Sequence, residues 1–381
     1  MKIPLVDICD FKGGTQPPKD EWIDHEEPGY IRMLQIRDFT QSEKNNIEYV
    51  KDTSNLKKCT PDDILIGRYG ASVGKILTGL SGAYNVAIVK TVPNKEKVCP
   101  QFLFHYFNAP YFQNHISSVG SRAAQAGFNK DDLGKLYFPL LPLDEQRRIA
   151  AVLDKVSGLI AKRREQLDKL DELVKARFVE MFGDPVSNPK GWNNGTIRDV
   201  VSEVKYGTSR PAVDGGTYKY LRMGNITFDG HLDLSDLKYI DIPDSELEKC
   251  MVRKGDVLFN RTNSKELVGK TCVFDLDEPM VIAGYIIRVR VNKKVLPIYL
   301  SAVLNSQYGK QILADMCKAI VGQANINAQE LQDIAILIPP IELQEKFSNS
   351  VETVKKSKLT IQQSLDKLEV LKKALMQQYF G

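Results

Sequence analysis

Basic, amide and aromatic side chains recur together in turn-rich segments of both halves of the sequence. In the first half these are Arg32, Gln35, Arg37, Arg68, Tyr69, Ser72, Lys75, Arg122 and Gln125. In the second half they are Arg210, Arg222, Asn225, Asn260, Arg261, Asn263, Lys265, Lys270, Gln323 and Asn325. Arginine pairs in bidentate fashion with guanine, Asn and Gln pair with adenine, and Lys holds phosphate. The pattern predicts contacts with double-stranded DNA, and its alternative is an ordinary set of solubilising loop residues.

No catalytic constellation accompanies these residues. The chain lacks a G-x-x-x-x-G-K-[ST] phosphate loop, and it lacks the Asn/Asp-Pro-Pro-aromatic tetrapeptide of an adenine or cytosine methyltransferase. The acidic pair Asp62-Asp63 is better interpreted as a turn before a strand than as a nuclease site. Six cysteines stand far apart without a C-x-x-C pair, which predicts buried thiols and neither disulfides nor a metal site. We therefore expect a binding protein that is not an enzyme and holds no cofactor.

Overall charge does not mark a dedicated nucleic-acid binder. The 381 residues include 52 Lys+Arg and 48 Asp+Glu, a net charge of +4, and the pI is about 8.5. A nucleic-acid-binding domain usually has a pI above about 9, so any polyanion site must come from charge placed locally. No apolar run approaches the roughly 18 residues of a membrane span, and no secretory signal is evident, so we expect a soluble cytoplasmic protein.

The sequence is an internal duplication. Residues 169–183 align with 367–381, and Pro142-Leu-Asp-Glu-Gln146 aligns with Pro340-Ile-Glu-Leu-Gln344. Further upstream Arg68 aligns with Arg261 and Lys75 with Lys270 in the same order, which favours binding over a chance surface pattern. The chain is thus two copies of one unit, about 1–183 and 184–381. Two long repeats predict a pseudo-two-fold molecule rather than a solenoid.

Each copy ends in a long amphipathic segment. Its apolar positions step by four and three residues, which is the seam of a coiled coil. They are Ile149, Leu153, Val156, Ile160, Leu167 and Leu170 in the first copy and Phe347, Val351, Val354, Ile361, Leu365 and Leu368 in the second. We expect the two helices to pair antiparallel within the chain. The alternative is that each helix packs only on its own front part.

The front parts predict an α+β fold with a mixed β-sheet and short helices. Short β-type runs occur at 64–66, 85–89, 256–259 and 285–291, between Gly, Asn, Asp and Pro punctuation. Residues 100–117 and 297–318 have helical spacing with a proline in the first turn, and residues 67–74 are expected to form a hairpin or loop. The predicted organisation is a front part at 1–143, a long helix at 144–183, a second front part at 184–340 and a second long helix at 341–381.

Several motifs together resemble the specificity subunit of type I DNA restriction-modification enzymes over essentially the whole chain. They include Lys12-Gly-Gly-Thr-Gln-Pro-Pro18, Asp63-Ile-Leu-Ile-Gly-Arg68, Tyr206-Gly-Thr208 and Leu221-Arg-Met-Gly-Asn-Ile226. The most specific is the Pro-[Leu/Ile]-x-x-Gln entry into a long helix at Pro142 and at Pro340.

This resemblance implies two target recognition domains, each reading one half of a bipartite DNA site. It also implies a helical spacer that sets the half-site separation and docks two methyltransferase subunits, with nuclease-translocase subunits joining the complex. S-adenosylmethionine, ATP and Mg would then belong to those partners. Two alternatives stay open: a related system with a fused methyltransferase-nuclease partner, and a coiled-coil scaffold that binds protein.

Two departures from the family pattern concern the proposed reading loops. Gln16 interrupts the usual Gly-Gly-Thr-Pro string, and the second copy lacks the double glycine. The segment 67–75 is shorter than its counterpart 260–270 and differs from it chemically. We therefore expect unlike half-sites and a target that is not a palindrome.

Overall fold

The computed structural model describes residues 1–41, 46–120, 127–264, 267–317 and 324–381. These form two units, one of Met1–Arg164 with Gln362–Gly381 and the other of Glu165–Ile361. Each unit therefore holds one front part and half of each long helix. The predicted limits of the recognition domains and spacers stay a prediction.

The first unit contains two four-stranded sheets and a strand pair. One sheet has the order β2 (Cys9–Gly13), β9 (Ile88–Pro93), β6 (Leu65–Gly67) and β7 (Ile76–Leu77), all antiparallel. The other has the order β4 (Tyr49–Lys51), β3 (Tyr30–Leu34), β8 (Gly82–Tyr84) and β5 (Lys58–Cys59), with β3 and β8 parallel. Strand β1 (Lys2–Pro4) pairs with β10 (Tyr137–Pro139).

The second unit repeats this topology and adds one further strand pair, β17 (Thr262–Asn263) with β21 (Ala324–Asn325). Its first sheet is β12 (Val201–Tyr206), β20 (Ile286–Val291), β16 (Val257–Asn260) and β18 (Thr271–Val273). Its second is β14 (Lys238–Ile240), β13 (Tyr218–Leu221), β19 (Met280–Ile282) and β15 (Met251–Val252), again with one parallel pair, β13 and β19. Strand β11 (Asn193–Thr196) pairs with β22 (Ala335–Ile338). The predicted α+β fold and the duplication are confirmed.

Short helices complete each unit. They are α1 (Ile36–Thr40), α4 (Lys130–Gly134), α6 (Ile197–Val200), α7 (Asp244–Cys250) and α10 (Ala328–Gln332). Single 3-10 turns lie at Leu5–Asp7, Lys19–Glu21, Gly70–Ser72 and Met223–Asn225. Among the predicted strands, the runs at 64–66, 256–259 and 285–291 match β6, β16 and β20 within one residue. The run at 85–89 is mostly wrong, because β9 begins only at Ile88.

The two helices predicted at 100–117 and 297–318 are each broken into two. The first divides into α2 (Pro100–Asn108) and α3 (Pro110–Gly120), because Pro110 forces Ala109 into an extended conformation with ψ 148°. The second divides into α8 (Pro297–Asn305) and α9 (Gln307–Met316). There Ser306 is extended, and its hydroxyl accepts a hydrogen bond from the N–H of Gly309 at 3.1 Å, an N-cap for the new helix.

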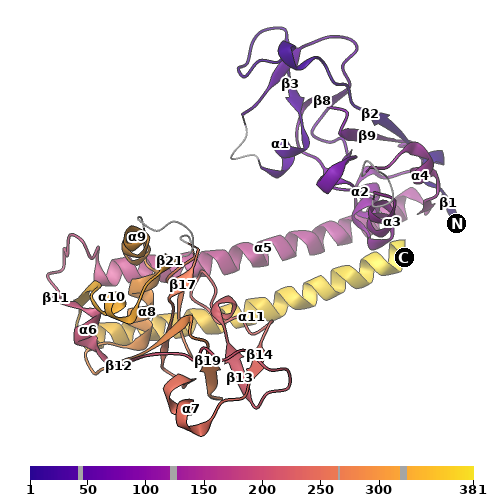
Figure 1. The fold of residues 1–381 in the computed structure, drawn as a ribbon. Helices are drawn as coiled ribbons and strands as arrows, with labels where there is room; N and C mark the ends of the chain where they lie inside the picture. The colour runs from indigo at the N-terminus through magenta and orange to yellow at the C-terminus, as the bar shows by residue number, and fades with distance from the viewer. Residues whose placement is uncertain (42–45, 121–126, 265–266, 318–323) are drawn as a thin grey trace. The chain divides into compact units, whose positions relative to one another are not determined.

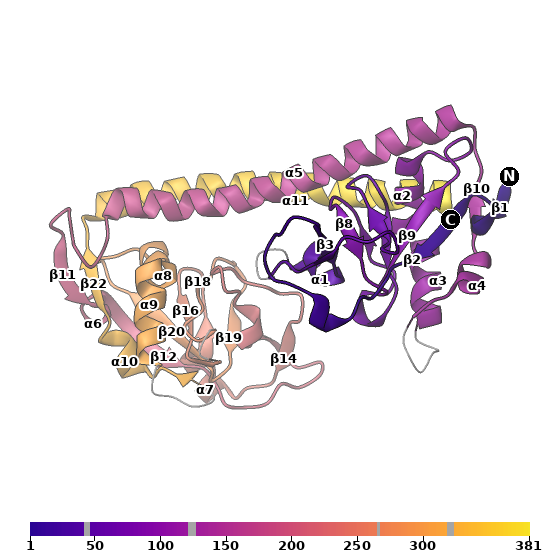
Figure 2. The ribbon, with the colours of Figure 1, turned by 90° about the horizontal axis from the view of Figure 1, so that it is seen from above.

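The long helices α5 (Leu143–Phe182) and α11 (Ile341–Phe380) have 40 residues each and lie side by side (Figures 1 and 2). In the first unit the start of α5 shares a core with the end of α11, including Ile149, Leu153 and Phe380. In the second unit the end of α5 packs on the start of α11, where the rings of Phe182 and Phe347 are 5.5 Å apart. The predicted antiparallel pair is therefore confirmed, and every predicted seam position is buried or half-buried.

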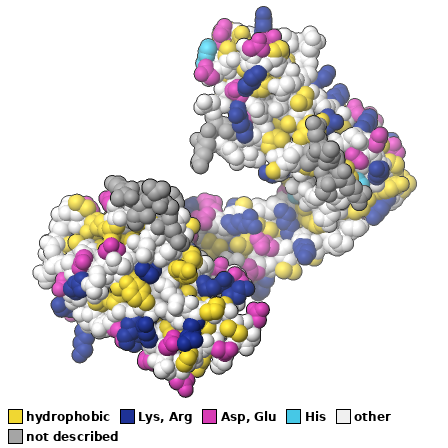
Figure 3. All heavy atoms as spheres, viewed as in Figure 1, with side chains coloured by type: hydrophobic (Ala, Val, Ile, Leu, Met, Phe, Trp, Pro, Cys, Tyr) yellow, Lys and Arg dark blue, Asp and Glu magenta, His cyan; other side chains and the backbone are white. Residues whose placement is uncertain are grey.

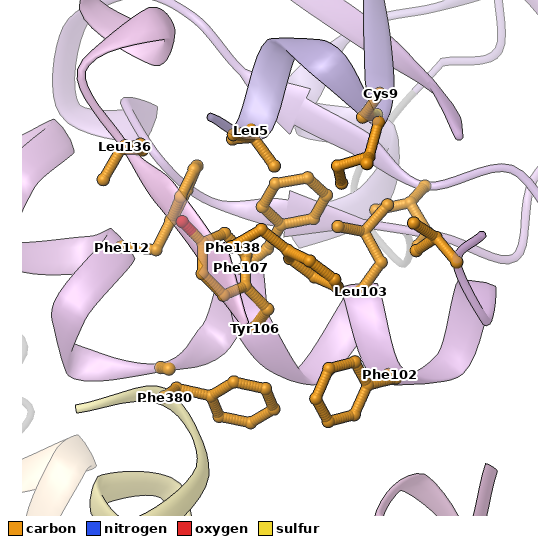
Figure 4. Close-up of a cluster of buried hydrophobic side chains, with 14 of the residues drawn as sticks. Leu5, Cys9, Phe102, Leu103, Tyr106, Phe107, Phe112, Leu136, Phe138 and Phe380 are labelled. Atoms are coloured by element: carbon orange, nitrogen blue, oxygen red, sulfur yellow. The ribbon is translucent and has the colours of Figure 1, made fainter. Parts of the chain in front are cut away.

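The core of the first unit shows how a long helix is attached to a front part. Figure 4 shows Phe380 of α11 facing the α2 side chains Phe102 and Tyr106. The ring centroids of Phe380 and Phe102 are 4.9 Å apart, and those of Phe102 and Phe138 are 5.6 Å apart. The end of α11 thus completes the core of the unit that contains β1–β10. No helix among the described residues has both the length and the apolarity needed to cross a membrane.

Candidate nucleic-acid interface

The segment predicted as a hairpin or loop connects β6 to β7 in the first unit. The N–H of Gly67 donates to the carbonyl of Lys75 at 2.8 Å, and Tyr69 forms a β-bridge with Gly127. The matching connection from β16 to β18 carries β17, which pairs with β21 after α9. We call the described residues of these connections, 67–75 in the first unit and 261–264 with 267–270 in the second, the two ledges, because backbone contacts attach each of them to its own unit.

Arg68 and Tyr69 lie together on the first ledge. The Nε of Arg68 donates to the carbonyl oxygen of Phe128 at 3.1 Å, and its guanidinium lies 5.0 Å from the centre of the Tyr69 ring. Tyr69 is exposed, Ser72 is half-buried, and Lys75 is exposed without an ion pair to any described residue. The Nε of Arg68 is thus used in a hydrogen bond within the fold, whereas the side chains of Tyr69 and Lys75 are accessible to a ligand.

Arg261 is held differently on the second ledge. Its guanidinium lies 4.8 Å from the centre of the Tyr206 ring and donates to no described residue, and its Nε is buried without a hydrogen-bond partner. It borders a pocket of about 390 Å³. The polar and charged lining includes Tyr206, Thr208, Ser209, Glu246, Lys249 and Arg261. A stacked arginine with free donors beside such a hollow can meet the acceptor edge of a base.

Other predicted contacts are occupied by carboxylates. In the first unit Arg32 pairs with Asp38 at 2.9 Å, while Arg37 and Gln35 both bind Glu48. In the second unit Arg210 makes two hydrogen bonds to Glu246, at 3.1 and 2.6 Å, and Arg222 pairs with Asp236 at 2.7 Å. The hydrogen bonds from Arg210 lower the pKa of Glu246. These cations are balanced in the free chain, so a nucleic acid would have to compete for them.

Three predicted contacts are buried, and the side chains of two of them, Asn225 and Lys270, hydrogen-bond backbone groups of the fold. The Asn225 side chain accepts a hydrogen bond from the N–H of Arg222 at 2.8 Å and donates to the carbonyl of Asp233 at 2.8 Å. Asn260 ends β16 and is fully buried. The ammonium of Lys270 donates to the carbonyl of Met223 at 2.9 Å, and burial lowers its pKa. These side chains shape the loops from inside, and their contact with bases stays a prediction.

The remaining predicted residues divide into accessible and undescribed ones. Asn325 is exposed on β21, where its Oδ1 accepts from the hydroxyl of Thr262 at 3.1 Å, and Asn263 lies beside it on β17. Arg122, Gln125, Lys265 and Gln323 lie outside the described residues. Sequence reasoning missed the pocket residues Thr208 and Lys249, although the motif Tyr206-Gly-Thr208 pointed to their neighbourhood.

The surface confirms that no bulk basic face exists on the side in view. Figure 3 shows Lys and Arg side chains scattered among acidic and apolar ones within each unit. The described residues contain no group of three His, Cys, Asp or Glu side chains arranged to hold a metal ion.

Comparisons with known proteins agree with this geometry. The family described as "Type I restriction modification DNA specificity domain" matches residues 1–171 and again residues 189–371. The chain is 22% identical over 376 residues to the type I restriction enzyme EcoKI specificity subunit of Escherichia coli (strain K12), covering 92% of this chain and 80% of that protein. It is 23% identical over 399 residues to the MjaVIII specificity subunit of Methanocaldococcus jannaschii, covering 98% and 90%.

A solved structure shares the fold. It is the crystal structure of the type I restriction-modification system S subunit from M. genitalium, with a TM-score of 0.61 at 13% identity. The match covers all of this chain and 96% of that one.

Proposed function

Since the chain belongs to the family of type I restriction-modification DNA specificity domains, as the matches over both copies show, we propose that each unit reads one half of a bipartite DNA target. The chain is a specificity subunit, and subunits of this kind are not catalytic. The two copies of one recognition fold support a two-part target, because each copy carries its own ledge beside its own sheet.

The observation that carries the proposal is the state of Arg261. Its guanidinium donates to no described residue, lies 4.8 Å from the centre of the Tyr206 ring and borders a pocket. Arginine in such a geometry suits the O6 and N7 acceptors of guanine. Arg68, its counterpart, already donates from Nε to Phe128. The two half-sites are therefore unlike, and the target is not a palindrome.

The paired helices serve as the spacer between the half-sites and as the surface that docks two methyltransferase subunits. Nuclease-translocase subunits join the same complex. Adenine methylation with S-adenosylmethionine, and cleavage that uses ATP and Mg, take place on those partners. The exposed apolar side chains Leu173, Val179, Leu359 and Val370 on the helices support a protein partner along them.

Two measurements test this function. Single-molecule sequencing of methylated bases in cells that carry this chain and its partners should return an asymmetric two-part motif with a fixed gap. A symmetric palindromic motif would contradict the unlike half-sites. The purified complex should bind that duplex with an affinity that falls steeply with salt, and salt-independent binding would contradict DNA recognition altogether.

A further inference from the structure

Lys310 on α9 has a side-chain ammonium that is shielded from solvent. Its ammonium nitrogen is buried and has no hydrogen-bond or ion-pair partner among the described residues. The group near it is the ring of Phe228, whose centre is 4.8 Å from the nitrogen. Burial lowers the pKa of Lys310 to about 8. An unpaired buried cation is costly unless something compensates for its lost hydration.

A second buried cation, Lys270, lies close enough to Lys310 to affect its charge. Lys270 is also buried; its ammonium donates to the carbonyl of Met223 and pairs with no carboxylate among the described residues. Burial is the main cause of the lowered pKa of Lys310; the negative charge of Asp229 opposes it, and the positive charge of Lys270 adds to it by a smaller amount. Two neighbouring cations without an ion pair are therefore built into one corner of the second unit.

Phe228 covers this corner from a firmly held turn. The N–H of Thr227 donates to the carbonyl of His231 at 2.9 Å. Gly230 adopts a φ of +83°, and a side chain there would meet the Asn305 amide at 2.6 Å. Phe228 itself is 51% exposed. The turn is thus anchored against α8 near Gly230, while the Phe228 ring next to the ammonium is in contact with solvent.

The first copy shows that the fold does not require a cation here. Helix α3 begins at Pro110 and α9 at Gln307, so Gln113 occupies the place of Lys310. The Gln113 amide donates to the carbonyls of Gly74 at 2.9 Å and Phe107 at 2.6 Å. A neutral amide is satisfied at this position, whereas the ammonium of the second copy is not. The lysine therefore serves something other than packing.

We propose that Lys310, uncovered when the Phe228 ring turns aside, binds a backbone phosphate of DNA in the second recognition unit. The inference rests on the proposed function, since it assigns the DNA backbone to this corner. An ammonium is a compact point charge that suits phosphate and carries no sequence information. Lys270 adds positive potential from behind, and Phe228 supplies an exposed ring beside the sugar-phosphate chain.

The test uses the full chain purified with its modification subunits and the variant Lys310→Gln, which installs the first copy's residue. Affinity is measured for the target duplex and for a scrambled duplex between about 50 and 200 mM salt. We expect about tenfold weaker binding to both duplexes. The slope of log K against log salt should fall by about 0.9, the value for one phosphate. Lys254→Gln is the matched control, because Lys254 pairs with Asp277 at 2.7 Å in the same unit.

The result for the wild-type complex tests DNA binding by the specificity subunit, and the result for Lys310→Gln tests the phosphate contact of Lys310. If the wild-type complex binds neither duplex, the proposed function fails. If it binds both and Lys310→Gln keeps the wild-type salt slope, the phosphate assignment fails while the function stands. A loss confined to the target duplex would make Lys310 a base contact and would also overturn the assignment.

Stability gives a readout that a structural role would not produce. Lys310→Met keeps an unbranched apolar chain under Phe228 and removes the buried charge, so the thermal midpoint of the full chain should rise. A lower midpoint would mean that the charge stabilises the fold and would overturn the proposal.

Inorganic phosphate, added at constant ionic strength, should not raise the wild-type midpoint more than that of Lys310→Gln. A wild-type-specific rise would indicate a site for free phosphate instead of DNA.

Discussion

The side-chain amide of Gln146 accepts a hydrogen bond from the backbone N–H of Cys99 at 2.9 Å. The same amide donates to the carbonyls of Lys97 and Leu141, each at 2.8 Å. Gln146 lies in the first turn of α5 and is fully buried, and Cys99 directly precedes α2. One side chain therefore fixes the long helix to the front part of its unit.

Gln344 repeats this arrangement in the second unit. It accepts from the N–H of Leu296 at 2.9 Å and donates to the carbonyls of Lys294 at 3.1 Å and Pro339 at 2.8 Å. The glutamine that ends the Pro-[Leu/Ile]-x-x-Gln motif thus has a physical role in both copies. It sets the direction in which the helix leaves the recognition fold.

Gln146→Leu should destabilise the chain by about 2–4 kcal/mol, because it leaves one buried N–H and two partly buried carbonyls unpaired and removes all three hydrogen bonds at once. Denaturant unfolding of the full chain measures this change. Gln362→Leu is the control, since Gln362 is exposed on α11, and it should shift stability by less than about 0.5 kcal/mol. Equal effects of the two variants would contradict the role assigned to Gln146.

Arg261→Ala should weaken binding of the target by about 1–3 kcal/mol and relax the sequence preference at one half-site only. The reason is that Arg261 has free donors beside the pocket and makes no side-chain hydrogen bond that the fold would lose. Binding to a panel of duplexes, each with one substituted base pair, measures the preference. Uniform weakening on every duplex would make Arg261 a phosphate contact.

His105 predicts an acid-sensitive element in the first unit. Its Nε2 lies 2.7 Å from Oδ1 of Asp154 on α5, and its ring is almost fully buried. Burial lowers its pKa even though Asp154 opposes the shift. The unfolded chain therefore binds a proton near pH 6.5 that the folded chain does not yet bind, so stability falls as the pH drops from about 6.5 toward the lowered value.

The variant His105→Gln should lose this part of the pH dependence. Denaturant midpoints of wild type and variant at about pH 7.5 and 5.5, on either side of the ordinary histidine value, isolate the contribution of His105 from those of other groups. A wild type that becomes more stable than the variant on acidification would contradict the sign of the shift.

The long helices could be predicted because their signal is local and repeated. The apolar positions from Ile149 to Leu170 and from Phe347 to Leu368 repeat every seven residues. Such a repeat can be recognised without knowing what the helix packs against. The broken helices could not be predicted as readily. Pro110 is the one sequence signal for the break between α2 and α3. The break between α8 and α9 occurs at Ser306, a residue type that is also common in loops and helices without a break.

The sequence does not show which candidate contact residues are exposed and unpaired, because this depends on residues that are distant in the sequence. Lys75 and Lys270 occupy matched positions, yet Lys75 is exposed and Lys270 is buried beneath the segment that contains Met223. Arg210 is occupied by Glu246 from another element. Sequence spacing places such residues in the same region, but it does not reveal which charges the fold has already paired.

The helix pair provides the last prediction, which concerns the gap between half-sites. Inserting seven residues into each helix, after Arg164 and after Ile361, keeps the heptad seam in phase. It lengthens the pair by about 10 Å at 1.5 Å per residue. The gap in the methylated motif should then grow by about three base pairs, at roughly 3.4 Å each.

Sequencing of methylated bases in cells carrying the variant measures the gap. An unchanged gap, with both half-sites still methylated, would contradict a spacer role for α5 and α11. A four-residue insertion in α5 alone is the control, because it shifts the seam out of register and should lower stability without producing a new defined gap.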